Sequence, residues 1–291
     1  MENIENFGKI GKKRPQLIET FHDLTRTTRI PLKLVQKSSI SKNTRIFRFA
    51  LPSPSHISGL EPGHHVRISN RVNDKCCGRL YTPISDDELV GFIDVLVKIY
   101  EKSEAFPSGG FFSQYLDNLR IGDIMNFRGP IYRHMYHGNG YFTSGHAVNE
   151  AEEILQHHLY KRMNLIAGGT GITPIWRIIN KTLKNPFDET QIRLLFANRT
   201  EDDILLRSDL ERLQRQHPQR FRLTHVLSQP AAERPWAGHI GHINTDLIDI
   251  ACFPPDDCTG FIVCGPRAMT ENAVLPALEE LEVDDEHIIV M

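Results

Sequence analysis

The chain has 291 residues, of which 40% are hydrophobic and 24% charged, so it is long enough for two globular domains of ordinary size. It contains no run of about 18 apolar residues and no apolar signal core near its start, so we expect a cytoplasmic protein without a transmembrane anchor. The five cysteines have no CxxC spacing, so we expect neither a disulfide framework nor a metal site.

The formal net charge of -2 conceals a difference between the two halves of the chain. Residues 1–150 carry 20 basic and 15 acidic side chains, a balance of +5, whereas residues 151–291 carry 14 and 21, a balance of -7. A basic half can steer an acidic protein partner toward itself. Because the basic residues are scattered along the chain, we do not expect nucleic-acid binding.

The first half of the chain has the pattern of short β-strands after a polar N-terminal tail at residues 1–28. Apolar and polar residues alternate in several short segments separated by turns, a pattern that predicts an antiparallel barrel or sandwich over residues 29–136. The alternating segments are 31–40, 44–51, 64–72, 78–85 and 92–100. A helix is expected at 109–119, followed by a last strand at 121–130.

The second half begins with a polar segment and then changes its period. Residues 137–160 have no clear pattern and are predicted to be an irregular linker. From residue 161 onward, short apolar runs alternate with segments of helical spacing, which predicts a doubly wound α/β domain with a parallel sheet over residues 161–291. The predicted strands are 162–169, 192–198, 221–228 and 260–265.

Two turns in the second half follow predicted strands, where a parallel sheet binds its ligands. The first, GGTGITP from Gly168 to Pro174, joins a strand to a helix. Its glycines would let a phosphate approach the backbone N–H groups, although such a turn also occurs in simple tight packing. The second turn, CGPRAM, runs from Cys264 to Met269. Its thiol either touches a cofactor ring or is a small buried side chain that ends a strand.

A third motif, GRLYTPIS at residues 78–85, places a positive charge, an aromatic ring and a hydroxyl almost side by side. Together with the two turns, Arg79-x-Tyr81-Thr82 resembles the motifs of the ferredoxin–NADP reductase-like flavoenzymes, most closely those of the NADH–cytochrome b5 reductases. Segments 106–130 and 194–207 are also similar to that subfamily. The resemblance covers residues 30–291.

The resemblance implies an antiparallel β-barrel domain that binds FAD, followed by an α/β domain that binds NADH and, as a second option, NADPH. Arg79 would bind the FAD pyrophosphate, Tyr81 would pack on the flavin, and Thr82 would lie near flavin N5. Lys98 and Cys264 complete the residues assigned to catalysis, with Cys264 beside the nicotinamide. The other implied cofactor-binding residues are Leu80, Leu96, Gly110, Phe111, Phe112, Ser113, Gly168, Gly169, Thr170, Gly171, Ile172, Thr173, Pro174, Ser228, Gly265, Pro266 and Met269.

Three positions depart from the subfamily pattern. Phe111 stands where the b5 reductases usually have a lysine, so one positive contact to FAD is lost. Ser228 replaces the usual aspartate that repels the 2′-phosphate of NADPH, and a serine hydroxyl can hydrogen-bond to that phosphate. We therefore expect relaxed selectivity between NADH and NADPH. Met291 replaces the usual C-terminal phenylalanine near the nicotinamide, whereas His65 matches a family histidine close to the flavin.

The function implied by the resemblance is an FAD-dependent reductase that takes a hydride from NADH onto flavin N5 and passes single electrons to cytochrome b5 or a similar haem protein. A quinone, a ferric chelate or an oxygenase subunit is an alternative acceptor. A non-catalytic nucleotide-binding regulator is a third reading, disfavoured because Thr82 and Cys264 are both present. We expect the protein to act as a monomer.

Overall fold

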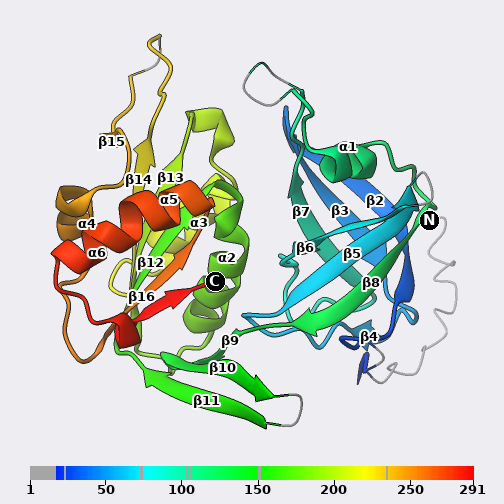
Figure 1. Ribbon diagram of the computed structural model, residues 1–291, viewed down its shortest axis with the longest axis horizontal. Coiled ribbons are helices and arrows are strands. Elements are labelled where there is room, and N and C mark those ends of the chain that lie inside the picture. The colour runs from blue at the N-terminus through cyan, green and yellow to red at the C-terminus, as the bar shows by residue number, and fades with distance from the viewer. Residues whose placement is uncertain are drawn as a thin grey trace, which may run out of the picture.

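The structure, a computed structural model, describes residues 18–22, 24–72, 75–102, 104, 107–149, 152–233 and 235–291. A β-barrel and an α/β domain lie side by side, and a β-hairpin extends from the connection between them (Figure 1). No described helix is long and apolar enough to cross a membrane.

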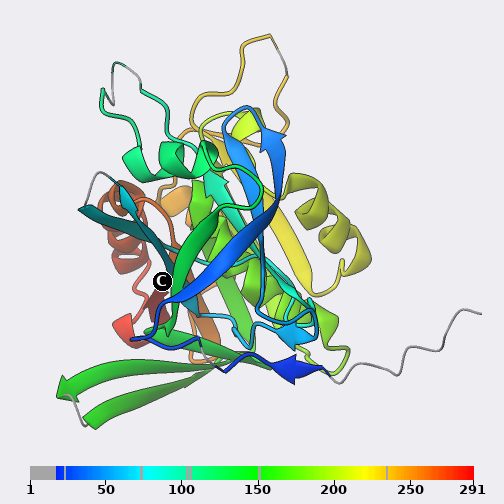
Figure 2. The same ribbon diagram turned by 90° about the vertical axis from the view of Figure 1, so that its right-hand side faces the viewer.

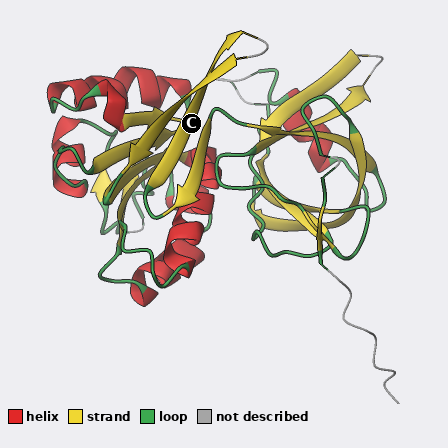
Figure 3. Ribbon diagram, turned by 90° about the horizontal axis from the view of Figure 1, so that it is seen from below, coloured by secondary structure: helices red, strands yellow, loops and turns green. Residues whose placement is uncertain are grey.

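Antiparallel strands form the first domain. Six of them make one sheet in the order β6-β5-β8-β2-β3-β7. Their bounds are β2 Ile30–Ser41, β3 Thr44–Ala50, β5 His65–Val72, β6 Lys75–Tyr81, β7 Phe92–Lys98 and β8 Ile124–Ile131; α1 spans Phe111–Asp117. Just beyond β6, Pro83 pairs with Val95 of β7, so the sheet closes into the barrel that Figure 3 shows from below. The predicted antiparallel barrel is confirmed.

The alternation of side chains along these strands fills the barrel interior. In β8, Met125 and Phe127 are fully buried, while their neighbours in the strand are partly or fully exposed, as the two-residue period of a strand requires. The rings of Phe49 and Phe127 meet edge to face with their centroids 4.9 Å apart. The strand pattern in the sequence is therefore the pattern of the core.

The end of the predicted N-terminal tail belongs to the barrel. Strand β1, Glu19–Thr20, pairs in parallel with β4, His56–Ile57, and the side chains of Phe21 and Leu24 are buried in the barrel core. The expectation of a loosely attached tail is wrong for the described residues 18–22 and 24–28, because two apolar side chains anchor them. Residues 1–17 lie outside the described residues.

The second domain is a parallel sheet with the strand order β15-β14-β13-β12-β16-β17. Its strands are β12 Arg162–Gly168, β13 Gln191–Asn198, β14 Phe221–Leu227, β15 His239–Ile240, β16 Thr259–Cys264 and β17 Ile288–Val290. Its α-helices are α2 Ile172–Lys184, α3 Arg207–Gln216, α4 Thr245–Ala251, α5 Arg267–Met269 and α6 Leu275–Glu280. The first strand in the chain, β12, lies in the middle, so the strand order reverses between β12 and β16. Ligands of such sheets bind at that reversal.

Helices cover both faces of this sheet. Leu165 of β12 packs in a cluster with side chains of α2 and α3, whereas the next residue, Ile166, packs in a second cluster with side chains of α4 and α6. Both residues are fully buried. The predicted doubly wound architecture is confirmed, and Figure 1 shows α2 on the side of the sheet that faces the barrel.

The segment between the domains is a regular antiparallel sheet. Strands β9 His134–Gly138, β10 Tyr141–Asn149 and β11 Glu152–Leu159 pair in the order β11-β10-β9, and the β10–β11 hairpin projects from the body of the protein (Figure 2). The expectation of irregular structure over residues 137–160 is wrong. Phe142 of β10 is fully buried, but Leu155 and Leu159 of β11 are exposed, so the apolar residues of this hairpin do not mark one buried face in the sequence.

Candidate active site

A cavity of about 940 Å³ lies between the two domains, at the reversal of strand order. The register of β12 against β16 places Ala167 beside Cys264, so the carboxyl ends of these strands meet there. The first domain lines the cavity with His65, Arg79, Leu80, Tyr81, Thr82, Leu96, Lys98, Tyr100, Gly110, Phe111, Phe112 and Ser113. The second domain lines it with Thr170, Gly171, Thr173, Pro174, Cys264, Gly265, Pro266 and Met291.

The first-domain wall is suited to a large, flat and anionic molecule. Leu80, Tyr100 and Phe111 expose 50%, 47% and 54% of their surface and line the same cavity, and exposed apolar side chains gathered in one place mark a ligand or partner site. The exposed Arg79 donates a hydrogen bond to the Gly78 carbonyl at 3.0 Å, and no carboxylate of the described residues pairs with it. An apolar platform beside an uncompensated guanidinium fits an aromatic ring that carries phosphates, such as FAD.

Thr82 is held at the cavity by a buried histidine. Its Oγ1 lies 2.7 Å from Nδ1 of His65, and Thr82 is only 6% exposed. Burial lowers the pKa of His65, so its imidazole is neutral near pH 7. The hydrogen bond therefore joins two neutral groups and fixes where the hydroxyl of Thr82 points.

The second-domain wall is a close contact between two backbone turns. A Cβ on Gly171 would lie 2.1 Å from the Cys264 carbonyl oxygen, so only glycine permits this approach. Burial raises the pKa of the Cys264 thiol to about 12, and the thiol is therefore protonated. A protonated thiol at this position can pack against a ring but is a poor nucleophile.

Lys98 connects the two walls. Its Nζ lies 2.7 Å from Oδ1 of Asp203, a residue of the second domain, and both side chains are largely buried. Burial raises the pKa of Asp203, but hydrogen bonds from Lys98 and Thr200 outweigh burial and hold that pKa below its usual value. The carboxylate is therefore ionised, and the lysine that the sequence suggested for catalysis is bound in an ion pair between the domains.

A second cavity of about 770 Å³ continues from the first along the carboxyl ends of β12, β13 and β14. The two cavities have Lys98, Tyr100, Thr170 and Pro266 in common. The second cavity also contacts the predicted residues Gly168, Gly169, Ser228 and Met269. Together the two cavities can hold two cofactors, which would come into contact where the cavities join.

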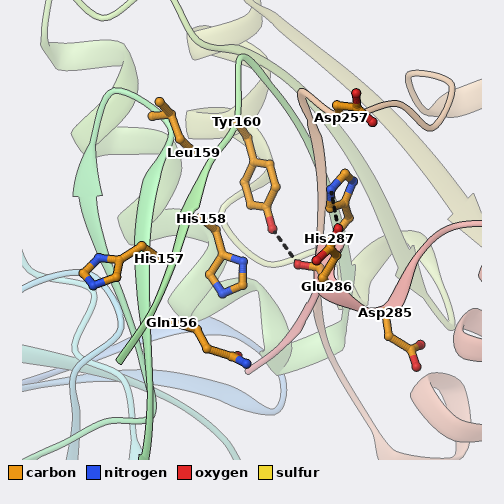
Figure 4. Close-up of a pocket in the computed structure, with 9 residues that line it drawn as sticks. All are labelled: Gln156, His157, His158, Leu159, Tyr160, Asp257, Asp285, Glu286 and His287. Atoms are coloured by element: carbon orange, nitrogen blue, oxygen red, sulfur yellow. Dashed lines mark hydrogen bonds and ion pairs between the residues drawn. The ribbon is translucent and has the colours of Figure 1, made fainter. Parts of the chain in front are cut away.

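Another cavity, of about 610 Å³, lies between β11 and the turn before β17 (Figure 4). Tyr160 donates a hydrogen bond from its hydroxyl to the Glu286 carbonyl at 3.2 Å, and His158 and His287 lie nearby. Asp257 and Glu286 come just before β16 and β17, so this cavity is at the amino ends of the parallel strands. Parallel sheets bind their ligands at the opposite edge.

Comparison with known proteins identifies the family. Two family models match, Oxidoreductase FAD-binding domain over residues 31–136 and Oxidoreductase NAD-binding domain over residues 165–274. NADH-cytochrome b5 reductase 2 of Mus musculus is 41% identical over 263 residues, which cover 89% of this chain and 93% of the mouse protein. The chain belongs to the NADH–cytochrome b5 reductase family.

Other relatives agree with this placement. NADH-cytochrome b5 reductase 3 of Rattus norvegicus is 43% identical, over 86% of this chain and 82% of the rat protein. The crystal structure of the cytochrome b5 reductase domain of Ulva prolifera nitrate reductase is similar with a TM-score of 0.84 and 35% identity, over 92% of this chain and 99% of that one. The resemblance seen in the motifs is confirmed, and the chain is an oxidoreductase with FAD- and NAD-binding domains.

With one exception, the residues expected from the b5 reductase pattern line one of the two cavities. The exception is Ile172, which begins α2 and is fully buried in the core of the second domain. Sequence reasoning missed Tyr100, Asn198 and Arg199, which also line the cavities. Asn198 and Arg199 lie at the carboxyl end of a predicted strand, and that position was the signal that could have found them.

Phe111 permits a direct test of a position that departs from the b5 reductase pattern. Because it is exposed and lines the cavity, a Phe111→Lys variant adds a positive charge where the FAD phosphates are expected. We expect this variant to bind FAD about twofold to fivefold more tightly in low salt, as the apoprotein titrated by flavin fluorescence. Phe111→Leu is the uncharged control and should not tighten binding. Equal FAD affinities of Phe111→Lys and Phe111→Leu would place the phosphates elsewhere.

Proposed function

We propose that this chain is an FAD-dependent reductase that takes a hydride from a reduced nicotinamide dinucleotide and passes electrons singly to cytochrome b5 or a similar haem protein. One observation carries the proposal: Thr82 of the barrel and Cys264 of the α/β domain line the same cavity. A flavin bound along Arg79–Thr82 would then meet a nicotinamide bound at the turn of Cys264.

The side chains divide the work of binding and orientation. FAD, when bound, would supply the redox chemistry, because its N5 accepts a hydride and the reduced ring releases electrons one at a time. Arg79 would neutralise its phosphates. With Nδ1–H of His65 donating to Oγ1 of Thr82, the Thr82 hydroxyl would donate a hydrogen bond toward the flavin. The protonated thiol of Cys264 would pack beside the nicotinamide without adding a charge. The chain contributes position and electrostatics to the reaction.

The electron acceptor follows from family membership and from charge. Two relatives that cover most of this chain, the mouse and rat reductases, are named for cytochrome b5. Residues 1–150, which include the barrel, carry a balance of +5 that would favour an acidic partner. A quinone, a ferric chelate or an oxygenase subunit is the alternative acceptor. These candidates differ in the rate at which each reoxidises the reduced enzyme.

The test is an anaerobic titration of the purified holoenzyme with NADH, and separately with NADPH, while the flavin absorbance is recorded. We expect either nucleotide to bleach the flavin as fully as dithionite does. Cytochrome b5 added to the bleached enzyme should then be reduced faster than a quinone or a ferric chelate. Bound FAD that neither nucleotide reduces would instead support a binding protein without turnover.

A further inference from the structure

The end of the second cavity that lies away from Cys264 is lined by polar and charged side chains that hydride transfer does not require. If a nicotinamide lies beside Cys264 and its phosphates lie at the turn of Gly168–Thr170, the adenosine half extends along the rest of that cavity. There it meets the carboxyl ends of β13 and β14, where Asn198, Arg199 and Ser228 line the wall.

Backbone hydrogen bonds place Arg199 and Ser228 next to each other. The Ser228 N–H donates to the Asn198 carbonyl at 3.0 Å, and the Gln229 N–H donates to the Arg199 carbonyl at 2.7 Å. The pairing of β13 with β14 therefore continues one step beyond both strands. Arg199, just after β13, and Ser228, just after β14, are therefore adjacent across the two strands. Both residues line the same cavity.

The charge of Arg199 is not compensated. Its Nη2 donates to the neutral amide oxygen of Gln229 at 2.9 Å, and no carboxylate of the described part of the chain forms an ion pair with it. The two acidic side chains that line this cavity are engaged elsewhere: Asp203 accepts from Lys98, and Glu280 accepts from the Thr245 hydroxyl at 2.5 Å.

A second observation points to a polar ligand at the same place. Asn198 is only 8% exposed, yet neither its amide nitrogen nor its amide oxygen has a hydrogen-bond partner among the described residues. A buried amide left without partners costs about 1–3 kcal/mol, which a ligand that reaches it would recover. The sugar hydroxyls of a nucleotide can both donate to it and accept from it.

We propose that Arg199 and Ser228 form a binding site for a phosphate monoester, the 2′-phosphate of NADPH, and that the chain therefore prefers NADPH over NADH. Sites for the unphosphorylated dinucleotide usually place a carboxylate on the ribose, whereas a nearby arginine accommodates the 2′-phosphate. The planar guanidinium binds two phosphate oxygens at once, and the serine hydroxyl donates to a third. The inference rests on the proposed function for the identity of the cavity, and it adds the direction of selectivity.

Equilibrium binding tests the site without turnover. The probes are 2′,5′-ADP and 5′-AMP, which differ only in the 2′-phosphate, titrated into the holoenzyme by calorimetry. We expect 2′,5′-ADP to bind about tenfold more tightly or better, with the ratio falling as salt is added. Arg199→Gln and Ser228→Asp should each bring the ratio close to one, Arg199→Gln by weakening 2′,5′-ADP and Ser228→Asp also by strengthening 5′-AMP, because a carboxylate can accept from the ribose 2′-hydroxyl. Arg267→Gln is the matched control, since Arg267 is highly exposed, pairs with Glu271 and does not line the cavity.

The outcomes separate this site from the reductase activity. Equal affinity of the wild-type holoenzyme for both probes overturns the 2′-phosphate site, even where NADH bleaches the flavin and the reductase stands. A tenfold preference that survives Arg199→Gln also overturns the assignment of Arg199. Preference lost in Arg199→Gln and Ser228→Asp but kept in Arg267→Gln supports the site.

Discussion

Replacing Arg177 with alanine is expected to lower the free energy of unfolding by about 3 kcal/mol and to slow the reduction of bound flavin by about tenfold. Arg177 of α2 is 5% exposed, and its guanidinium donates to the carbonyls of Ser85, at 3.0 Å, and Leu60. It also pairs with Asp87. All three partners belong to the barrel, so the variant leaves two carbonyls of the interface without their donor.

The effect on flavin reduction follows from where these partners lie. Ile84 and Ser85 follow the flavin-side segment Arg79–Thr82 after a single intervening residue, and α2 begins directly after the glycine turn of the other wall. Trp176 adds a hydrogen bond from its indole N–H to the Ile84 carbonyl at 3.3 Å. One helix turn thus joins the two walls of the cavity, and a shift of about 1 Å between reacting groups can slow a reaction strongly.

Lys184→Ala is the matched control for Arg177→Ala. Lys184 lies two turns further along α2 and pairs with Asp86 of the same barrel loop, but both side chains are about half exposed. Exposed pairs contribute at most about 1 kcal/mol, so we expect little change in stability or rate. Urea unfolding and anaerobic stopped-flow reduction by NADH or NADPH measure the two effects. A destabilised Arg177→Ala that reduces its flavin at the wild-type rate would show that this contact serves folding alone.

Local sequence patterns predicted most helices and strands and the motifs that line the active-site cavity, because each of these features is formed by residues close together in the sequence. Alternation in Thr44–Ala50 gave a strand, and the glycine turn after β12 gave a strand–helix junction. Arg79, Tyr81 and Thr82 were found because their motif is local. The hairpin of β10 and β11 was missed because the two strands are held together by backbone pairing, and the exposed Leu155 and Leu159 of β11 do not alternate with polar residues as a half-buried strand would.

Contacts across the interface were beyond the reach of sequence patterns. Arg177 binds backbone carbonyls 92 and 117 positions away, and a carbonyl has the same chemistry in every residue. Arg199 is a different case, since its place after a buried strand marks it as a ligand-facing position. A charged or polar side chain at the end of a predicted strand can be identified as ligand-binding from the sequence. A side chain that binds backbone groups far away in the chain can be identified only once the fold is known.

Gly171→Ala is expected to cost about 3 kcal/mol of unfolding free energy and to reduce the rate of flavin reduction about a hundredfold. The new Cβ would lie 2.1 Å from the Cys264 carbonyl oxygen, 2.5 Å from its carbonyl carbon and 2.8 Å from the Gly265 nitrogen. These are backbone atoms that no rotamer change can move. Relief of the clash must therefore separate the glycine turn from β16, at the point where the nicotinamide is expected.

Gly169→Ala distinguishes this clash from backbone strain. Gly169 lies in the same turn with a φ of +51°, and a Cβ there would meet nothing within 4 Å, so alanine should cost only about 1–2 kcal/mol. Gly171 has an ordinary φ of -61°, so alanine there is strained only by contact. We expect Gly169→Ala to keep most of its rate of flavin reduction, measured anaerobically beside Gly171→Ala. Equal losses of rate in the two variants would mean that the turn needs its backbone conformation, and that the close approach to Cys264 does not set the position of the nicotinamide.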